Sequence, residues 1–190
     1  MKYIDKNNSK ALLAHLLKIS DDIKMNELID QDGFSLLHMS VFKNKGKSFD
    51  AIIKKARDEL SKHELAEWVN LATTKDQFVA LHYASYRGNI HFCESLIENG
   101  ANIKKKNAYG LNVLHIAAQG DQPISLFFFR TKGMDLVSKD NRGSTPLHWA
   151  CFQNSEIALI YLLGWLKQNT LNMQDIDGYT PLHLAVKSAE

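Results

Sequence analysis

The chain has 190 residues, 45% of them hydrophobic, and a formal net charge of +2 at pH 7. This length and apolar content suit one folded domain with a continuous core. So small a charge gives no reason to expect a nucleic acid or an anionic membrane as partner. The longest apolar stretch, residues 157–166, is about half as long as a bilayer crossing requires, so we expect no direct membrane insertion by this chain.

The first segment, residues 1–29, is predicted to be an N-terminal helical cap. It holds no apolar signal region at its start. A helix that begins near Ser9 would place four leucines on one face, and that face would cover the unit that follows. The leucines are Leu12, Leu13, Leu16 and Leu17.

A short phrase ending in histidine recurs five times in residues 30–190, at intervals of 44, 33, 33 and 35 residues. The histidines are His38, His82, His115, His148 and His183. A period in the thirties indicates one small unit copied along the chain. We place the units at about 30–72, 73–106, 107–139, 140–174 and, as a partial unit, 175–190. Stacked units of this kind form an elongated surface for binding partners and need no catalytic centre.

The fourth unit shows the pattern most clearly. Gly143 indicates a turn, Thr145 is a suitable helix N-cap, and Pro146 suits the first helical position. A short first helix follows, Asn154 and Ser155 end it, and residues 157–166 are predicted to form a second, mostly buried helix. Each unit therefore reads as turn, helix, short loop, helix and an extended finger.

The irregular intervals predict where the units differ. The 44-residue interval implies about eleven extra residues, which we place between Lys54 and Trp68 as a lengthened second helix with an added turn. The 35-residue interval adds two residues near Lys167 to Thr170. Gln77 stands where the other fingers have glycine, and residues 127–129, all phenylalanine, are predicted to be core. The last unit stops before any second helix, so we expect more protein to follow.

The unit resembles the ankyrin repeat. The resemblance covers about 160 residues, from Asp30 to the end, and is most specific in residues 143–150 and 178–185. It implies an all-α solenoid of helix-turn-helix units. It also implies that the five histidines are structural, with each one bonded to the backbone of the neighbouring finger. Catalytic motifs are absent from the sequence, and we expect no catalytic residue and no cofactor.

Two places in each unit should face the concave side of such a solenoid. They are the residue after the finger glycine and the residues just before the break between helices. Recurrent exposed aromatics there favour a partner-binding stripe, although several of them could instead pack between units. Trp149 is added because its size would let it both pack and present an edge. The candidates are Phe34, Phe42, Phe78, Tyr86, Leu111, Trp149, Phe152 and Tyr179.

Other features leave alternatives open. The lysines at 104–106 could favour an acidic partner, but a solvated lysine run is the commoner explanation. Cys93 and Cys151 lack CxxC spacing and lie among apolar residues. We therefore expect no disulfide, no metal site, and a reducing, cytoplasmic location.

A narrower resemblance concerns residues 139–150. This run is similar to the ankyrin region of DHHC-type protein S-acyltransferases, membrane enzymes whose repeats recruit substrate proteins on the cytosolic side. The resemblance implies that Trp149 helps to grip an extended segment of a partner. The catalytic Asp-His-His-Cys stretch is absent from these 190 residues, so no catalytic role transfers. The alternative is a free-standing ankyrin adaptor, and in either case we expect a monomer that binds a protein or an extended peptide.

Overall fold

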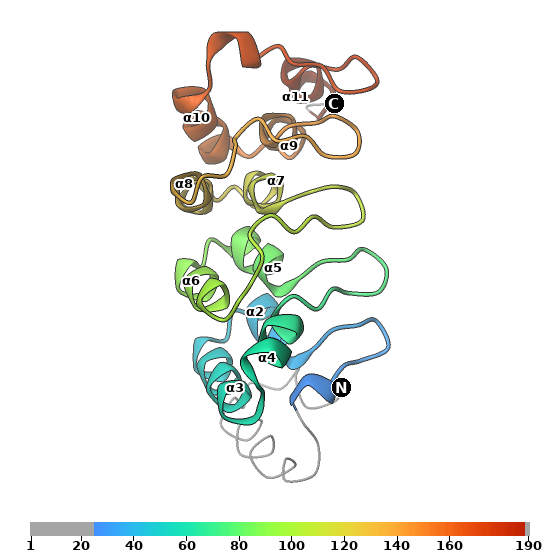
Figure 1. Cartoon of the computed structure of the whole chain (residues 1–190). Coiled ribbons are helices and arrows are strands. Elements are labelled where there is room, and N and C mark those ends of the chain that lie inside the picture. Colours follow the sequence, from blue (N-terminus) through green and yellow to red (C-terminus); the bar gives the residue numbers. More distant parts are fainter. Residues whose placement is uncertain (1–24, 189–190) are drawn as a thin grey trace.

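The computed structural model describes residues 25–188 as a row of helix pairs with extended fingers on one side (Figure 1). The all-α solenoid predicted from the sequence is confirmed. The predicted helix built on Leu12, Leu13, Leu16 and Leu17 lies outside the described residues. Within residues 25–188, the helices are all too short or too polar to cross a bilayer.

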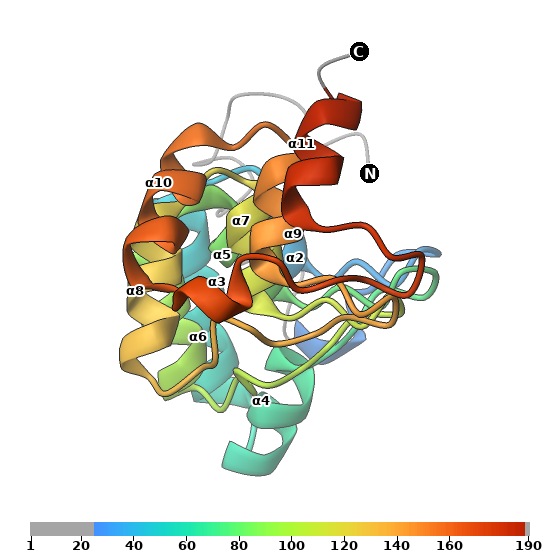
Figure 2. The ribbon, with the colours of Figure 1, turned by 90° about the horizontal axis from the view of Figure 1, so that it is seen from above.

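The helices alternate between an inner and an outer row. The inner helices are α2 (Leu36–Phe42), α5 (Ala80–Arg87), α7 (Val113–Gln119), α9 (Pro146–Phe152) and α11 (Pro181–Ser188). The outer helices are α3 (Gly46–Glu59), α6 (Ile90–Glu98), α8 (Pro123–Thr131) and α10 (Glu156–Trp165). Seen from above, the inner row lies between the outer row and the fingers (Figure 2). Two short 3-10 helices, η1 (Met25–Glu27) and η2 (Gln168–Thr170), and one further α-helix, α4 (Lys62–Val69), lie outside these two rows.

Each inner helix begins in the same way because the repeat histidine caps it. The histidine Nδ1 accepts the backbone N–H of the residue three positions earlier, at 3.1–3.2 Å in all five units. Thr145 is the N-cap of α9 and Pro146 is its first residue, as the sequence predicted.

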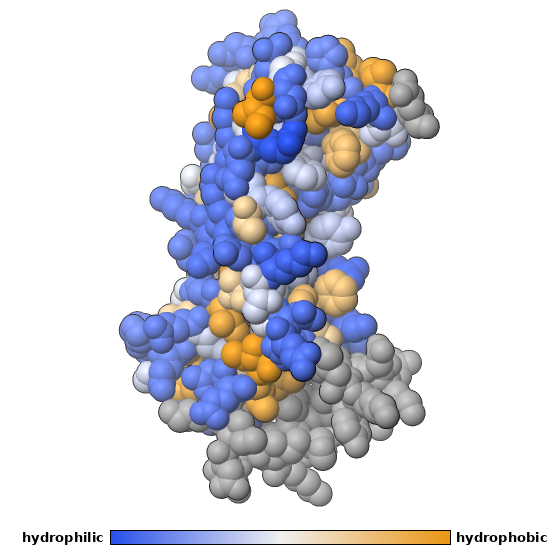
Figure 3. Space-filling model, turned by 90° about the vertical axis from the view of Figure 1, so that its right-hand side faces the viewer, coloured by the Kyte–Doolittle hydropathy of each residue, from blue (hydrophilic) through white to orange (hydrophobic). Residues whose placement is uncertain are grey.

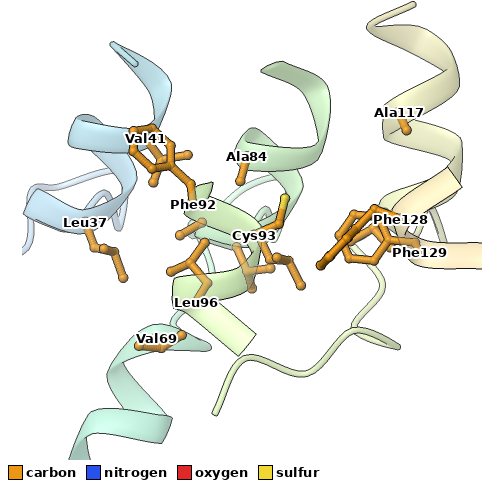
Figure 4. Close-up of a cluster of buried hydrophobic side chains, with 14 of the residues drawn as sticks. Leu37, Val41, Val69, Ala84, Phe92, Cys93, Leu96, Ala117, Phe128 and Phe129 are labelled. Atoms are coloured by element: carbon orange, nitrogen blue, oxygen red, sulfur yellow. The ribbon is translucent and has the colours of Figure 1, made fainter. Parts of the chain in front are cut away.

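The core runs between the two rows. Phe92, Cys93 and Leu96 of α6 lie between side chains of α2 on one side and Phe128 and Phe129 of α8 on the other (Figure 4). Phe49 and Phe92 pack with their ring centroids 4.3 Å apart, which joins the first two units. Both cysteines are free and buried, and burial raises the pKa of the Cys93 thiol to about 12.

The insertion in the first unit differs from its prediction. The second helix is lengthened, since α3 has 14 residues where α6 has 9. Most of the remaining residues, together with part of the linker to the next finger, form a separate helix, α4 (Lys62–Val69), which buries Leu65, Trp68 and Val69. One extra residue lies in the finger instead. Thr73 Oγ1 accepts the N–H of Phe78, five positions on, where Asp30 Oδ1 accepts that of Phe34, four positions on.

Two burial predictions were wrong. Phe127 is exposed, and only Phe128 and Phe129 of that run are core. In α10, only Ala158 and Leu162 are buried, although the whole stretch was expected to be mostly covered. The reason is geometric: one helix face packs against α8 and α9, while apolar residues also occupy the outer face.

Candidate functional site

A groove runs between the fingers and the inner helices. The fingers form one of its walls, and main-chain hydrogen bonds join each finger to the next. The N–H groups of Ala108, Asn141 and Ile176 donate to carbonyls of the preceding finger, at 2.8–3.1 Å. Within four of the five fingers, an Asp or Asn side chain accepts two backbone N–H groups. Asp140 Oδ1, for example, accepts those of Arg142 and Ser144 at 2.9 Å. The wall is therefore held in shape before any partner binds.

The repeat histidines connect the inner helices to this wall. The Nε2 atoms of His82, His115 and His148 lie 3.1–3.2 Å from the carbonyl oxygens of Lys105, Ser144 and Tyr179, in the next finger along the chain. Since Nδ1 accepts a backbone N–H, Nε2 carries the proton and donates it. His183, in the last described helix, is exposed; it hydrogen-bonds to Thr180, and its ring meets that of Tyr179 edge to face at 6.3 Å.

Burial keeps these imidazoles neutral at pH 7. Desolvation lowers the pKa of His38, His82 and His115 to about 4, and it also lowers the pKa of His148. Buried neutral imidazoles, of which those of His82, His115 and His148 bond backbone through both nitrogens, position the chain and are poorly placed for proton transfer to a bound molecule.

An aromatic cluster lines the groove at its N-terminal end. The rings of Phe34, Phe42 and Phe78 surround Tyr83, with centroids 5.9, 5.7 and 5.5 Å from its ring. We call these four residues the N-terminal aromatic cluster. Phe42 is exposed, and the Arg87 guanidinium lies 5.6 Å from its ring centroid. Three members were predicted from the sequence, but Tyr83, the centre of the cluster, was not among the predicted contact residues. Its place after a repeat histidine, the same as that of Trp149, was the available signal.

A pocket of about 220 Å³ lies at the C-terminal end of the groove. Trp149, Phe152, Tyr179 and Leu184 line it, and we call it the C-terminal pocket. Trp149 Nε1 donates to Asp140 Oδ2 at 2.8 Å, which fixes the indole, and the Trp149 and Phe152 rings meet edge to face at 6.0 Å.

The rim of the pocket is charged. Arg142 pairs with Asp177 across two neighbouring fingers, and Asp175 lies beside them. The Lys187 ammonium lies 5.1 Å from the Tyr179 ring centroid. An apolar floor with charges of both signs at its edge suits an apolar side chain within a polar peptide.

The middle of the groove is closed. Leu111 was predicted to face a partner, but only 3% of it is exposed, so it offers no contact surface. Ile116 is buried as well. Helix α7 packs between α5 and α9, and only Gln119 in this helix is partly open.

Tyr86 and the lysine run at 104–106 lie outside the two ends of the groove. Tyr86 is exposed on the last turn of α5, between the cluster and the closed middle. In the lysine run, Lys106 Nζ donates to the Lys139 carbonyl in the next finger at 2.9 Å, so it supports the wall. Figure 3 shows the finger side as mainly hydrophilic, with hydrophobic residues gathered toward its two ends.

Comparison with known families identifies the unit. One model of ankyrin repeats, in three copies, matches residues 114–190, and a second, of many copies, matches residues 81–130. The chain belongs to the ankyrin-repeat family. Ankyrin repeats generally bind proteins and are not catalytic, and four of the five repeat histidines, His82, His115, His148 and His183, lie within the matched residues.

Several known ankyrin proteins resemble the chain. Inversin of the dog, Canis lupus familiaris, is 28% identical over 94% of this chain. The palmitoyltransferase AKR1 of Lachancea kluyveri is 30% identical over 54% of it. The putative palmitoyltransferase ZDHHC13 of Danio rerio is 31% identical over 54% of it. The chain spans only 15%, 14% and 16% of these proteins, respectively.

Proposed function

We propose that the chain binds an extended segment of a partner protein in the groove between the inner helices and the fingers. The observation that carries this proposal is the pair of open apolar sites at the two ends of the groove, on a wall already held by main-chain bonds. Rigid sites of this kind lose little conformational entropy on binding. Exposed aromatic rings are also the side chains that most often dominate binding energies.

The two sites set the length of the bound segment. Tyr83 and Trp149 each follow a repeat histidine and are two units apart. Neighbouring inner helices pack about 8–10 Å apart, so the two sites are separated by roughly 16–20 Å. An extended chain advances about 3.3 Å per residue. The partner therefore carries two apolar anchors about five or six residues apart, with polar residues between them over the closed middle.

A positively charged side chain beside each of the two sites favours acidic residues in the partner. Arg87 lies at the end of α5 next to the N-terminal aromatic cluster, and Lys187 lies near the end of α11 next to the C-terminal pocket. Acidic residues next to the anchors would meet these two cations, which fixes the register of the bound segment.

We also propose that this groove is the cytosolic substrate-recruiting region of a larger protein, such as a DHHC-type acyltransferase. The support is the resemblance of residues 139–150 and the similarity to two proteins named as palmitoyltransferases. The alternative, a cytoplasmic adaptor without an enzyme domain, is supported by the match with inversin, which covers more of the chain. In both cases the chain acts as a monomer, because each groove is complete within one copy.

The groove is tested with fluorescein-labelled peptides that carry two leucines, each beside a glutamate, separated by two, five or ten serine and glycine residues. Fluorescence anisotropy should show tightest binding for the five-residue spacer. Trp149→Ala should weaken that binding by about 30-fold, which corresponds to about 2 kcal/mol. The triple variant Phe42→Ser, Tyr86→Ser and Phe152→Ser should abolish it.

Ile157→Ser is the matched control, because Ile157 is an exposed apolar residue on an outer helix and its loss should leave peptide affinity unchanged. Equal affinity for all three spacers, or an unchanged affinity in Trp149→Ala, would contradict the proposal that the groove binds a two-anchor segment. The acyltransferase link is tested separately, by measuring palmitate on the bound partner in cells that carry the full-length gene with and without Trp149→Ala. Unmodified partner in both would favour the adaptor.

A further inference from the structure

The outer helices present two solvent-facing positions per unit, three residues apart. In α3 these positions hold Lys47 and Asp50, and in α6 they hold His91 and Glu94. The next two units, at steps of 33 residues, carry large apolar residues at the same places. These are Ile124 and Phe127 in α8, and Ile157 and Ile160 in α10. The outer surface therefore changes from charged to apolar halfway along the stack.

These four apolar residues, which we call the outer apolar patch, are 50%, 46%, 57% and 71% exposed, respectively. Stacking of units does not cover them. Residues 124 and 127 stay exposed although α10 packs beside α8. Residues 157 and 160 occupy the same positions on α10, so a unit stacked beside α10 in the same way would leave them exposed too. Figures 1 and 2 show α8 and α10 side by side on the face away from the fingers. A contiguous patch of this kind on a helical surface is typical of an interface.

The surroundings of α10 support the same interpretation. Ala158 and Leu162 face the core, while Ile157, Ile160 and Leu163 face out, so the helix is apolar on nearly every side. Helices of this type are normally covered all round. Gly164 follows on the outer row, and a Cβ placed there would meet no atom within 4 Å. The space beside Ile160 is therefore open to a bulky side chain of a partner.

Charges at the edges of the patch indicate what covers it. Arg130 and Lys132 lie at the C-terminal end of α8, and Lys167 follows α10. The Arg130 guanidinium is stacked on the Trp165 ring at 3.5 Å, which holds a positive charge at this end. At the opposite end, Glu156 begins α10. An anionic membrane would meet this carboxylate unfavourably, whereas a protein with charge of both signs can match both ends.

We propose that the outer apolar patch is a second docking surface, which binds an amphipathic helix of another protein. Helices α8 and α10 have 9 and 10 residues, so at 1.5 Å per residue the patch accommodates about three turns of a partner helix. That helix places its apolar stripe along the two rows of the patch. Its acidic residues lie at the end that faces Arg130, Lys132 and Lys167.

The test uses a synthetic amphipathic peptide of about 16 residues, since shorter helices are marginal in water. It carries leucines along one face and glutamates toward one end. Phe127→Ser combined with Ile160→Ser should weaken its binding by at least tenfold, and Gly164→Gln should do so by filling the open space. Both changes lie on the surface, and circular dichroism should show unchanged helix content. Lys132→Glu combined with Lys167→Glu should weaken binding of the acidic peptide and strengthen binding of a lysine-containing version.

Trp149→Ala serves as the control, because it alters the groove and should leave this peptide's affinity unchanged. The proposal is overturned if the patch variants bind the peptide like the unmodified chain. It is also overturned if the patch instead mediates binding to vesicles of phosphatidylcholine and phosphatidylserine, or self-association detected by sedimentation. Groove binding of the two-anchor peptide is measured in parallel, so the failure of one surface is distinguishable from the failure of the other.

Discussion

At the scale of the residue, the repeat histidine determines much of the structure because one ring serves two backbone segments. Nδ1 of His115 accepts the N–H that begins its own helix, and its Nε2 contacts the Ser144 carbonyl of the next finger at 3.1 Å. The first contact requires the neutral ring, because a protonated Nδ1 cannot accept a hydrogen bond. The same side chain that begins a helix therefore also fixes the distance between neighbouring units.

Acid should destabilise the fold because these rings cannot become charged in place. The pKa of His38, His82 and His115 is about 4 in the folded chain, against about 6.5 when unfolded. The unfolded state therefore binds more protons below pH 6.5, and stability is lost as the pH falls from 6.5 toward 4. At pH 5 each histidine should cost about 2 kcal/mol, which urea unfolding at pH 7.5 and 5.0 would measure.

The variant His115→Gln isolates one contribution, because glutamine does not titrate. Its stability should depend less steeply on pH between 6.5 and 5 than that of the unmodified chain, whatever its stability at pH 7.5. The same slope in both proteins would show that this histidine is not held neutral by the fold.

At the scale of the element, the finger depends on glycine where two backbones meet. Gly110 has φ +79°, and a Cβ there would lie 2.6 Å from the backbone nitrogen of Asn141. Gly133 has φ +83° but has no neighbour within 4 Å. Gly133→Ala should therefore cost only the left-handed strain, about 1 kcal/mol. Gly110→Ala should cost at least twice as much, because it also pushes the next finger away. Equal losses in thermal or urea unfolding would contradict the close approach.

Local rules explain why the elements could be predicted from the sequence and their exposure could not. The start of α9 follows from Thr145 and Pro146, whose preferences act within one turn. The burial of Leu111 and the exposure of Phe127 depend on which faces the neighbouring units cover. A local sequence pattern does not predict that coverage. The separate helix α4 was missed because the insertion was assigned by interval length alone. The Ser61–Glu64 capping box at its start was the available signal.

At the scale of the whole molecule, each unit is stabilised by the units beside it, and the last described helix lacks one such neighbour. Leu182 in α11 is 71% exposed, whereas Leu147, at the same place in α9, is 2% exposed. Stability in stacked repeats is close to a sum of unit and interface terms. The backbone amides of α11 should therefore exchange with deuterium at least tenfold faster than those of α7 and α9. Uniform protection along the stack would contradict this additive view.

The joints between units also determine how the molecule responds to force. At the joints beside α5, α7 and α9, a main-chain bond such as Ile176 N–H to the Arg142 carbonyl acts together with an imidazole bond such as that of His148. These joints follow one another in series, so a pull along the row loads each of them equally and none shares the load of another. Under tension the units should separate singly, and the chain should lengthen in steps of about one unit.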